Sequence, residues 1–245
     1  MNSNKLKINV QKAHILTMGT QTRLNSLPNK LEVKLGGIQL EESPAKSEVL
    51  LGCKVQANLK WNLHIEMVIS KLGKRISGLA HLRYICPLKV KKFVTEGIFN
   101  GVITYCLPLF GGMGSGLVKD IQKLQNKAAR MVCNAPPTSQ RKDLYVKLDW
   151  MTVNQLLVYH SILNVFKIHS QKDPEYLATW LCKDSRNGHI MIPRTNLSLA
   201  NDSFCFRGPC MWNLLPKEMR SLHKLEVFRK KLRSWVIDTV PQFLD

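Results

Sequence analysis

The stretch Asn62–Arg83, NLHIEMVISKLGKRISGLAHLR, decides the fold class of most of this 245-residue chain. Apolar residues recur in it at steps of three and four, which is the period of an α-helix with one buried face. They are Ile65, Val68, Ile69, Leu72, Ile76, Leu79 and Leu82. The cations Lys71, Lys74 and Arg75 lie mostly off this stripe. We therefore predict a helix with one face in a core and a cationic line on another.

The same period predicts two further helices downstream. Pro87 starts one of them, at a position that proline tolerates, and Pro108 with Gly111-Gly112 ends it. Its predicted inward residues are Val90, Val94, Ile98 and Val102. The next helix is predicted from about Gly116 to Cys133, with Leu117, Ile121, Leu124, Ala128 and Met131 inward. Its outer face carries Lys119, Lys123, Lys127 and Arg130.

Helical signals also follow residue 150. Thr152 with Gln155 three residues later is a capping-box pattern, which predicts a helix start. The core face of that helix is Leu156, Tyr159, Leu163 and Phe166. Asp173-Pro174 opens a shorter predicted helix through Leu181, and Cys182–Asn201 reads as irregular. A last helix is predicted over Leu225–Ile237, with Phe228, Leu232 and Trp235 inward and the cations Arg229, Lys230, Lys231 and Arg233 around them.

The first 60 or so residues read differently, as short strands. Leu31–Leu35 and Ile38–Leu40 alternate apolar with polar residues, and Gly36-Gly37 between them is a tight-turn signal. The apolar run Val49–Val55 is a candidate third strand beside this hairpin, and Lys5–Met18 alternates in part. The predicted fold class is α+β, with a small antiparallel β part at the N-terminus followed by a mostly α-helical remainder.

The charge balance points to a polyanionic partner. Lys and Arg number 36 against 17 Asp and Glu, a formal net charge of +19. Such a surplus repels itself unless a polyanion or counter-ions offset it. Nucleic acid is the commonest partner of this kind, ahead of an anionic membrane surface. Aromatic residues make up only 7% of the chain, so dense stacking on bases is not the obvious binding mode.

Targeting and metal-binding signals are weak. No apolar run is long enough to predict a membrane span, and the polar N-terminus does not resemble a signal peptide. We expect an intracellular protein, in the nucleus or cytoplasm. The seven cysteines are scattered, and Cys182, His189, Cys205 and Cys210 lack the spacing of a zinc site. We therefore predict no metal site, and no catalytic Ser/His/Asp or Cys/His arrangement stands out.

Several segments, taken in order, resemble one family. Leu6–Lys12 is similar to a Leu-x-Leu-Asn-x-x-Lys-Thr segment, with Ala13 in place of Thr. Leu51–His64 is similar to Leu-Gly-x-x-x-(acidic)-x-x-Leu-x-Trp-x-x-His, with Gln56 at the acidic position. Leu124–Arg130 resembles Leu-Gln-Asn-Lys-Ala-Leu-Arg, and Phe204–Pro216 resembles Phe-x-Tyr-Arg-Gly-x-x-x-Trp-Asn-x-Leu-Pro. These segments are typical of non-LTR retrotransposon reverse transcriptases, the jockey-like branch above all.

The resemblance implies three regions: the end of a polymerase palm (1–64), a helical thumb-like region (65–150) and a C-terminal helical extension (151–245). It places the paired catalytic aspartates before residue 1, so no catalytic residue is expected here. Mg²⁺ is implied for the complete parent enzyme, an RNA-directed DNA polymerase, but no cofactor for this chain alone. It also implies that Lys12 lies near the incoming nucleotide, where a mobile positive charge is suited to a triphosphate.

The predicted nucleic-acid contacts are the cations on two helices: Lys71, Lys74, Arg75, Lys119, Lys123, Lys127 and Arg130. A thumb holds RNA and DNA through the phosphate backbone, which needs rows of cations on one side of a helix. A solvated helix face gives the same pattern. The C-terminal set beginning at Arg229 suits RNA binding or solubility equally, and the sequence identifies no protein partner.

Two functions stay open. In the first, the chain is a fragment of a reverse transcriptase that binds nucleic acid without polymerising alone. In the second, it is a stand-alone basic helical module, adopted by a host, that binds nucleic acid or protein.

Arg207-Gly208 with Trp212-Asn213 is expected to form a structural corner, in which the glycine allows a turn and the Asn satisfies turn amides.

Overall fold

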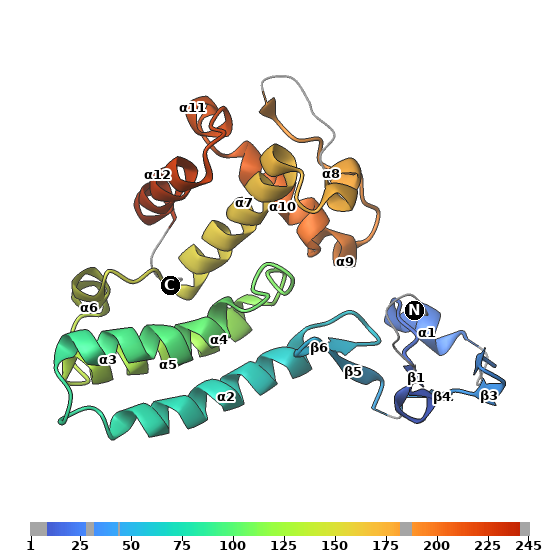
Figure 1. The fold of residues 1–245 in the computed structure, drawn as a ribbon, viewed down its shortest axis with the longest axis horizontal. Helices are drawn as coiled ribbons and strands as arrows, with labels where there is room; N and C mark the ends of the chain where they lie inside the picture. The colour runs from blue at the N-terminus through green and yellow to red at the C-terminus, as the bar shows by residue number, and fades with distance from the viewer. Residues whose placement is uncertain (1–8, 28–31, 44, 182–187, 241–245) are drawn as a thin grey trace. The chain divides into compact units, whose positions relative to one another are not determined.

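The computed structural model describes residues 9–27, 32–43, 45–181 and 188–240 (Figure 1). Internal contacts divide the chain into two compact units, residues 1–64 and 65–245. The described part is mostly helical with a few small sheets, which is an α+β composition in the general sense. The predicted strand segment from Lys5 to Ile8 lies outside the described residues.

The glycine-turn hairpin of the first unit is confirmed. Strand β2 (Lys34–Leu35) pairs antiparallel with β3 (Ile38–Gln39). Gly36 and Gly37 make the turn at φ 58° and 83°. Both angles are in the left-handed region that glycine adopts without steric strain. A Gly-Gly pair between two alternating segments was therefore a sufficient signal for this turn.

The predicted three-stranded antiparallel sheet is wrong. The run Val49–Val55 is not one strand but most of a second hairpin, β5 (Ser47–Leu50) with β6 (Cys53–Gln56). Leu51 and Gly52, both at positive φ, turn the chain between them. Strand β1 (His14–Ile15) pairs in parallel with β4 (Glu41–Glu42). The described strands therefore form three separate pairs, one of them parallel.

Two short helical turns also lie in the first unit. The 3₁₀ turn η2 (Val10–Lys12) follows Asn9. Helix α1 (Gln21–Asn25) lies in a segment rich in Thr, Asn and Ser, and the Thr20 hydroxyl accepts a hydrogen bond from the Arg23 backbone N–H at its start. Polar side chains of this type favour helix caps.

Helix α2 (Asn62–Ala80) confirms the helix that was predicted within Asn62–Arg83. Five residues of the predicted stripe are buried: Ile65, Val68, Leu72, Ile76 and Leu79. Ile69 and Leu82 are partly buried. The first helical face was readable because its apolar residues keep an unbroken three-and-four spacing.

The second predicted helix is present, but its predicted inward face is wrong. It consists of α3 (Leu88–Thr95), the π-helix η3 (Glu96–Asn100) and α4 (Gly101–Thr104). The buried residues are Lys91, Thr95, Phe99 and Ile103, whereas Val90 and Ile98 are exposed. The inward line has a four-residue step because the π-helix widens one turn. This buried line begins with the polar residue Lys91, so the spacing of apolar residues did not predict it.

Helix α5 (Ser115–Cys133) agrees with its predicted span to within one residue. Ile121, Ala128 and Met131 are buried as predicted, while Leu117 and Leu124 are only partly buried. Helix α6 (Arg141–Leu148) follows and was not predicted. It packs on α5, and α3 also packs on α5 (Figure 1).

Helix α7 (Val153–Gln171) is the centre of the C-terminal part. The predicted capping box is confirmed, since the Thr152 hydroxyl accepts from the Gln155 N–H and the Gln155 side chain accepts from the Thr152 N–H. The helices that follow are α8 (Glu175–Leu181), α9 (Ser198–Asn201), α10 (Phe204–Asn213), α11 (Lys217–Arg220) and α12 (Leu225–Thr239). Of these, α8, α10 and α12 pack on α7. In α7, Leu156, Leu163 and Phe166 are buried and Tyr159 is partly buried.

The expected corner at Arg207-Gly208 is wrong, because both residues lie inside helix α10. Gly208 serves close packing rather than a turn: a Cβ there would lie 2.9 Å from Val165 Cγ2 on α7. Asn213 has the predicted amide role, since it donates to and accepts from the backbone of Ile190. Trp212 is fully buried and donates to the Gly188 carbonyl. These residues hold the fold together.

Candidate nucleic-acid interface

The cations of α5 lie along one side of the helix. Their spacing of four, four and three residues keeps them in line. From Lys119 to Arg130 the row extends about 16 Å at an α-helical rise of about 1.5 Å per residue. Lys119, Lys123 and Lys127 are exposed. We call these three residues the α5 lysine row.

A buried polar network fixes the packed side of α5. Gln122 Nε2 donates to the Tyr145 hydroxyl at 2.6 Å, and Gln122 Oε1 accepts from the Val153 N–H at 2.9 Å. Gln125 Nε2 donates to the Met151 carbonyl, and the Tyr145 hydroxyl lies 2.9 Å from Asn126 Oδ1. This network ties α5 to α6 and to the start of α7. The lysine row is therefore presented by a helix whose orientation is set by hydrogen-bonded side chains.

The network also explains part of the Leu124–Arg130 motif. Gln125 and Asn126 are buried hydrogen-bonding residues, and Ala128 and Ala129 have no exposed surface. Within the motif, Lys127 is the residue that stands out into solvent. Sequence reasoning identified the cations of this helix and missed the inward glutamines, although their three-residue spacing from Gln122 to Gln125 was visible.

Lys123 of the row has an acidic neighbour. Lys123 Nζ lies 2.8 Å from Asp120 Oδ1, one helical turn back. Both side chains are well exposed, and an exposed pair of this kind contributes little to stability. Asp120 is the one acidic residue of α5. It partly neutralises the row without burying it.

Arg130 does not extend the row cleanly. Its side chain is half-buried, and its Nε is buried with no hydrogen-bond partner among the described residues. It lies close enough to Tyr145 to act on that hydroxyl electrostatically, although burial dominates and raises the pKa of Tyr145. Arg130 is thus in line with the row by its spacing, but its side chain lies at the edge of the core.

The second predicted set lies on α2, and its residues are exposed. Lys71, Lys74 and Arg75 fall within about one helical turn of each other. Arg75 has a structural role as well, because its Nη1 donates to the Ile98 carbonyl of η3. This contact fastens α2 to the neighbouring helix. Within the described part of the chain, Lys71 and Lys74 are the cations of this set that face solvent.

Lys91 links the helices that carry the two sets, and sequence reasoning missed it. Its amine donates to the Arg83 carbonyl at 3.0 Å and to Asn134 Oδ1 at 2.9 Å. Arg83 follows α2, and Asn134 caps the C-terminal end of α5. A lysine is rarely buried without partners, and its position in a charged run gave no sign of burial.

The other predicted cations lie elsewhere. Lys12 is exposed at the end of η2 in the first unit. Arg233 of the C-terminal set is committed to Asp149, with both its contacts at 2.7 Å. Arg229, Lys230 and Lys231 are exposed on α12.

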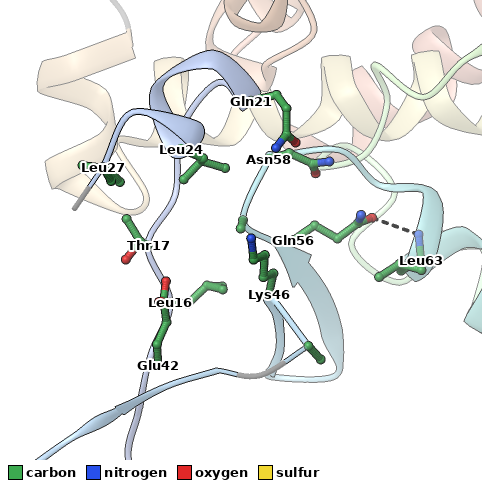
Figure 2. A pocket seen from close by; sticks show the side chains of 12 residues that line it. Leu16, Thr17, Gln21, Leu24, Leu27, Glu42, Lys46, Gln56, Asn58 and Leu63 are labelled. Atoms are coloured by element: carbon green, nitrogen blue, oxygen red, sulfur yellow. Dashed lines mark hydrogen bonds between the residues drawn. The ribbon is translucent and has the colours of Figure 1, made fainter. Parts of the chain in front are cut away.

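The first unit contains a pocket of about 320 Å³, lined by Leu16, Thr17, Gln21, Leu24, Leu27, Glu42, Ala45, Lys46, Gln56, Ala57, Asn58 and Leu63 (Figure 2). Its one carboxylate is Glu42, on strand β4. Gln56, which stands at an acidic position of the resembled motif, accepts a hydrogen bond from the Leu63 N–H at 2.9 Å. Its amide therefore helps to start α2 rather than serving a metal.

The described residues do not suit the metal chemistry of a polymerase. That chemistry needs carboxylates grouped around two divalent ions. Glu41 and Glu42 are exposed, and no three His, Cys, Asp or Glu residues of the described ranges lie close enough to hold a metal ion. Cys205 and Cys210 are partly buried on α10, and burial raises the pKa of both thiols. Cys182 lies outside the described residues.

Two further findings bear on identity. Among the described helices, none is long and apolar enough to cross a membrane. Compared with protein-family models, with curated proteins and with solved structures, the chain matches none of them.

Proposed function

We propose that this chain binds the phosphate backbone of RNA and DNA through the cations of α5 and α2. In this proposal it is the thumb-side fragment of a non-LTR retrotransposon reverse transcriptase, and it does not polymerise alone because it lacks the paired aspartates. The α5 lysine row carries the proposal. Three exposed amines stand in line on a helix whose packed side is fixed by a buried network.

The geometry suits a backbone partner rather than a base-reading one. Lysine amines at the end of flexible stems are point charges that follow a phosphate chain without reading sequence. The net charge of +19 supplies long-range attraction for any polyanion. Asp120 is the one acidic residue of α5, and it weakens this attraction.

The test is a salt series with a labelled RNA–DNA duplex, comparing the unsubstituted protein with K119A/K123A/K127A. Each lost phosphate contact lowers the salt slope by about 1, so the triple variant should lose about 3 units. The matched control is K34A/K217A/K224A, which removes the same charge from exposed residues on other elements. Equal losses in both variants would leave only non-specific attraction and would sink the proposal.

The second function, a host-adopted helical module, is favoured by one observation. Residues 65–245 form a compact unit of their own. An upstream reading frame that ends in paired aspartates would support the polymerase fragment. A spliced transcript that begins at Met1 would support the separate module instead. Transcript mapping of the locus distinguishes the two, and both retain the same backbone-binding prediction for α5.

A further inference from the structure

The segment from Lys89 to Tyr105 has two opposite faces with the same four-residue step. Its inward line is buried: Lys91, Thr95, Phe99 and Ile103. A second line of residues is offset from the buried line by two positions, and all of its members are exposed: Lys89, Phe93, Gly97, Gly101 and Tyr105. We call this second set the outward line. The π-helix η3 keeps both lines in phase, because it widens one turn of a helix that otherwise has 3.6 residues per turn.

The outward line is unusually aromatic for an exposed surface. Phe93 is 78% exposed and Tyr105 is 52% exposed. In the turn just before α3, Tyr84 is 82% exposed. A contiguous exposed apolar patch generally marks a binding site. Aromatic residues make up only 7% of the chain, but three of the four exposed Phe and Tyr rings among the described residues, Tyr84, Phe93 and Tyr105, lie within residues 84–105.

The surface between the two rings is bare. Gly97 and Gly101 lie between Phe93 and Tyr105, and a Cβ added at either glycine would meet nothing within 4 Å. Since glycine in a helix interior is about 1 kcal/mol less favourable than alanine, two glycines here weaken the helix while leaving a flat floor between the rings.

The charges of this segment favour an anionic occupant. Lys89 lies one turn before Phe93 on the same line, and the Arg83 guanidinium lies 5.3 Å from the centre of the Tyr84 ring. The one acid of residues 88–105 is Glu96. Its carboxylate is already engaged, accepting from Trp150 Nε1 at 2.8 Å and pairing with Lys92 at 3.7 Å.

We propose that the outward line binds single-stranded nucleic acid, with unpaired bases stacking on Phe93 and Tyr105 above the glycine floor. A single strand supplies both phosphates for the cations and flat rings for the aromatics, whereas the base faces of a duplex are hidden in its own stack. Stacking of this kind tolerates any base sequence. The inference rests on the nucleic-acid proposal above and assigns the single strand to a surface separate from the α5 lysine row.

The test measures anisotropy of a labelled oligothymidylate of about 20 nucleotides across a salt series. Phe93→Ala should weaken binding about tenfold, because one stacked base contributes on that order. The ratio to the unsubstituted protein should stay constant as salt rises, since stacking is not a charge interaction. Phe93→Trp should retain binding. Tyr176→Ala is the matched control, because Tyr176 is 72% exposed on α8, away from this segment.

A second variant fills the floor without threatening the fold. Gly97→Leu adds a side chain where nothing lies within 4 Å and raises helix propensity. It should unfold at higher denaturant concentration and yet bind oligothymidylate more weakly. If Gly97→Leu binds as tightly as the unsubstituted protein, the floor is not a binding surface and the proposal is overturned.

The two proposals fail in different ways. Loss of duplex affinity from the α5 triple variant, with Phe93→Ala no weaker than Tyr176→Ala on oligothymidylate, would overturn only the single-strand surface. Insensitivity of duplex binding to the α5 lysines would overturn the backbone proposal. If Phe93→Ala changes only self-association, seen by light scattering, the face is a protein–protein surface and the stacking proposal is wrong.

Discussion

Lys91 Nζ lies 2.9 Å from Asn134 Oδ1, and this bond joins the middle of α3 to the residue that ends α5. The same amine donates to the carbonyl of Arg83, which follows α2. One buried lysine therefore holds three helical segments in register. Its partners are a carbonyl and an amide, so the charge is solvated by hydrogen bonds within the protein rather than paired with an acid.

Replacing Lys91 by methionine should destabilise the protein by about 1–3 kcal/mol, because the two part-buried hydrogen bonds that its buried amine donates are lost. Urea unfolding followed by circular dichroism gives the change in midpoint. Lys89→Met is the control, since Lys89 is exposed two residues away, and its effect should stay within about 0.5 kcal/mol. Equal shifts for both variants would mean that the Lys91 bonds contribute nothing.

Stability at alkaline pH should report on Tyr145. Burial raises the pKa of this phenol above its ordinary value. The folded state therefore disfavours ionisation, and the stabilisation is complete below the unfolded pKa of about 10 and falls as pH rises above it. Urea midpoints between about pH 8 and pH 11 should fall more steeply for the native protein than for Tyr145→Phe, which cannot ionise. Parallel profiles would contradict the buried-phenol explanation.

Two glycine-to-alanine variants should change stability in opposite directions. Gly208→Ala places a Cβ 2.9 Å from Val165 Cγ2, so overpacking between α10 and α7 should destabilise by about 1–3 kcal/mol. Gly78→Ala on α2 meets nothing within 4 Å and should stabilise by about 0.5–1 kcal/mol through helix propensity. Thermal unfolding of both variants checks the signs. A neutral Gly208→Ala would show that α7 can move away freely.

Removing the acid beside the lysine row should strengthen duplex binding. Asp120→Asn releases Lys123 from its 2.8 Å ion pair and lowers local repulsion of phosphates. Duplex affinity at low salt should rise a few-fold, and the gain should shrink as salt screens the charges. Asp238→Asn changes net charge equally on exposed α12 and is the control. The same gain from both variants would leave a general charge effect only.

The sequence predicted best where one physical signal acted alone. The buried stripe of α2 follows from apolar spacing, and the start of α7 follows from the Thr152–Gln155 capping box. The inward face of α3 did not follow, because Lys91 is polar by type and is buried through partners that lie 8 and 43 residues away. Spacing along one segment cannot reveal such partners.

The candidate site divides in the same way. The positions of Lys119, Lys123 and Lys127 on one exposed side could be read from their spacing alone. The surroundings of Arg75 and Arg130 could not be predicted in this way. Arg75 donates to a carbonyl of η3, and Arg130 lies at the edge of the core. Helix α10 was missed because Gly208 and Pro209 suggest a turn, while close packing on α7 and a fully buried Trp212 favour a helix.

The wide turn at Glu96–Asn100 has a consequence for which changes this chain tolerates. This turn holds about one residue more than a regular α-helical turn does. Deleting one residue there would let the turn close to an α-helix and keep Ile103 on the buried side. Inserting one residue into the regular helix α3 would instead rotate everything after it by about 100° and take Phe99 and Ile103 out of the core. The constraint on length therefore falls on the α-helical parts of this segment, and the wide turn is the place where the loss of one residue should be tolerated.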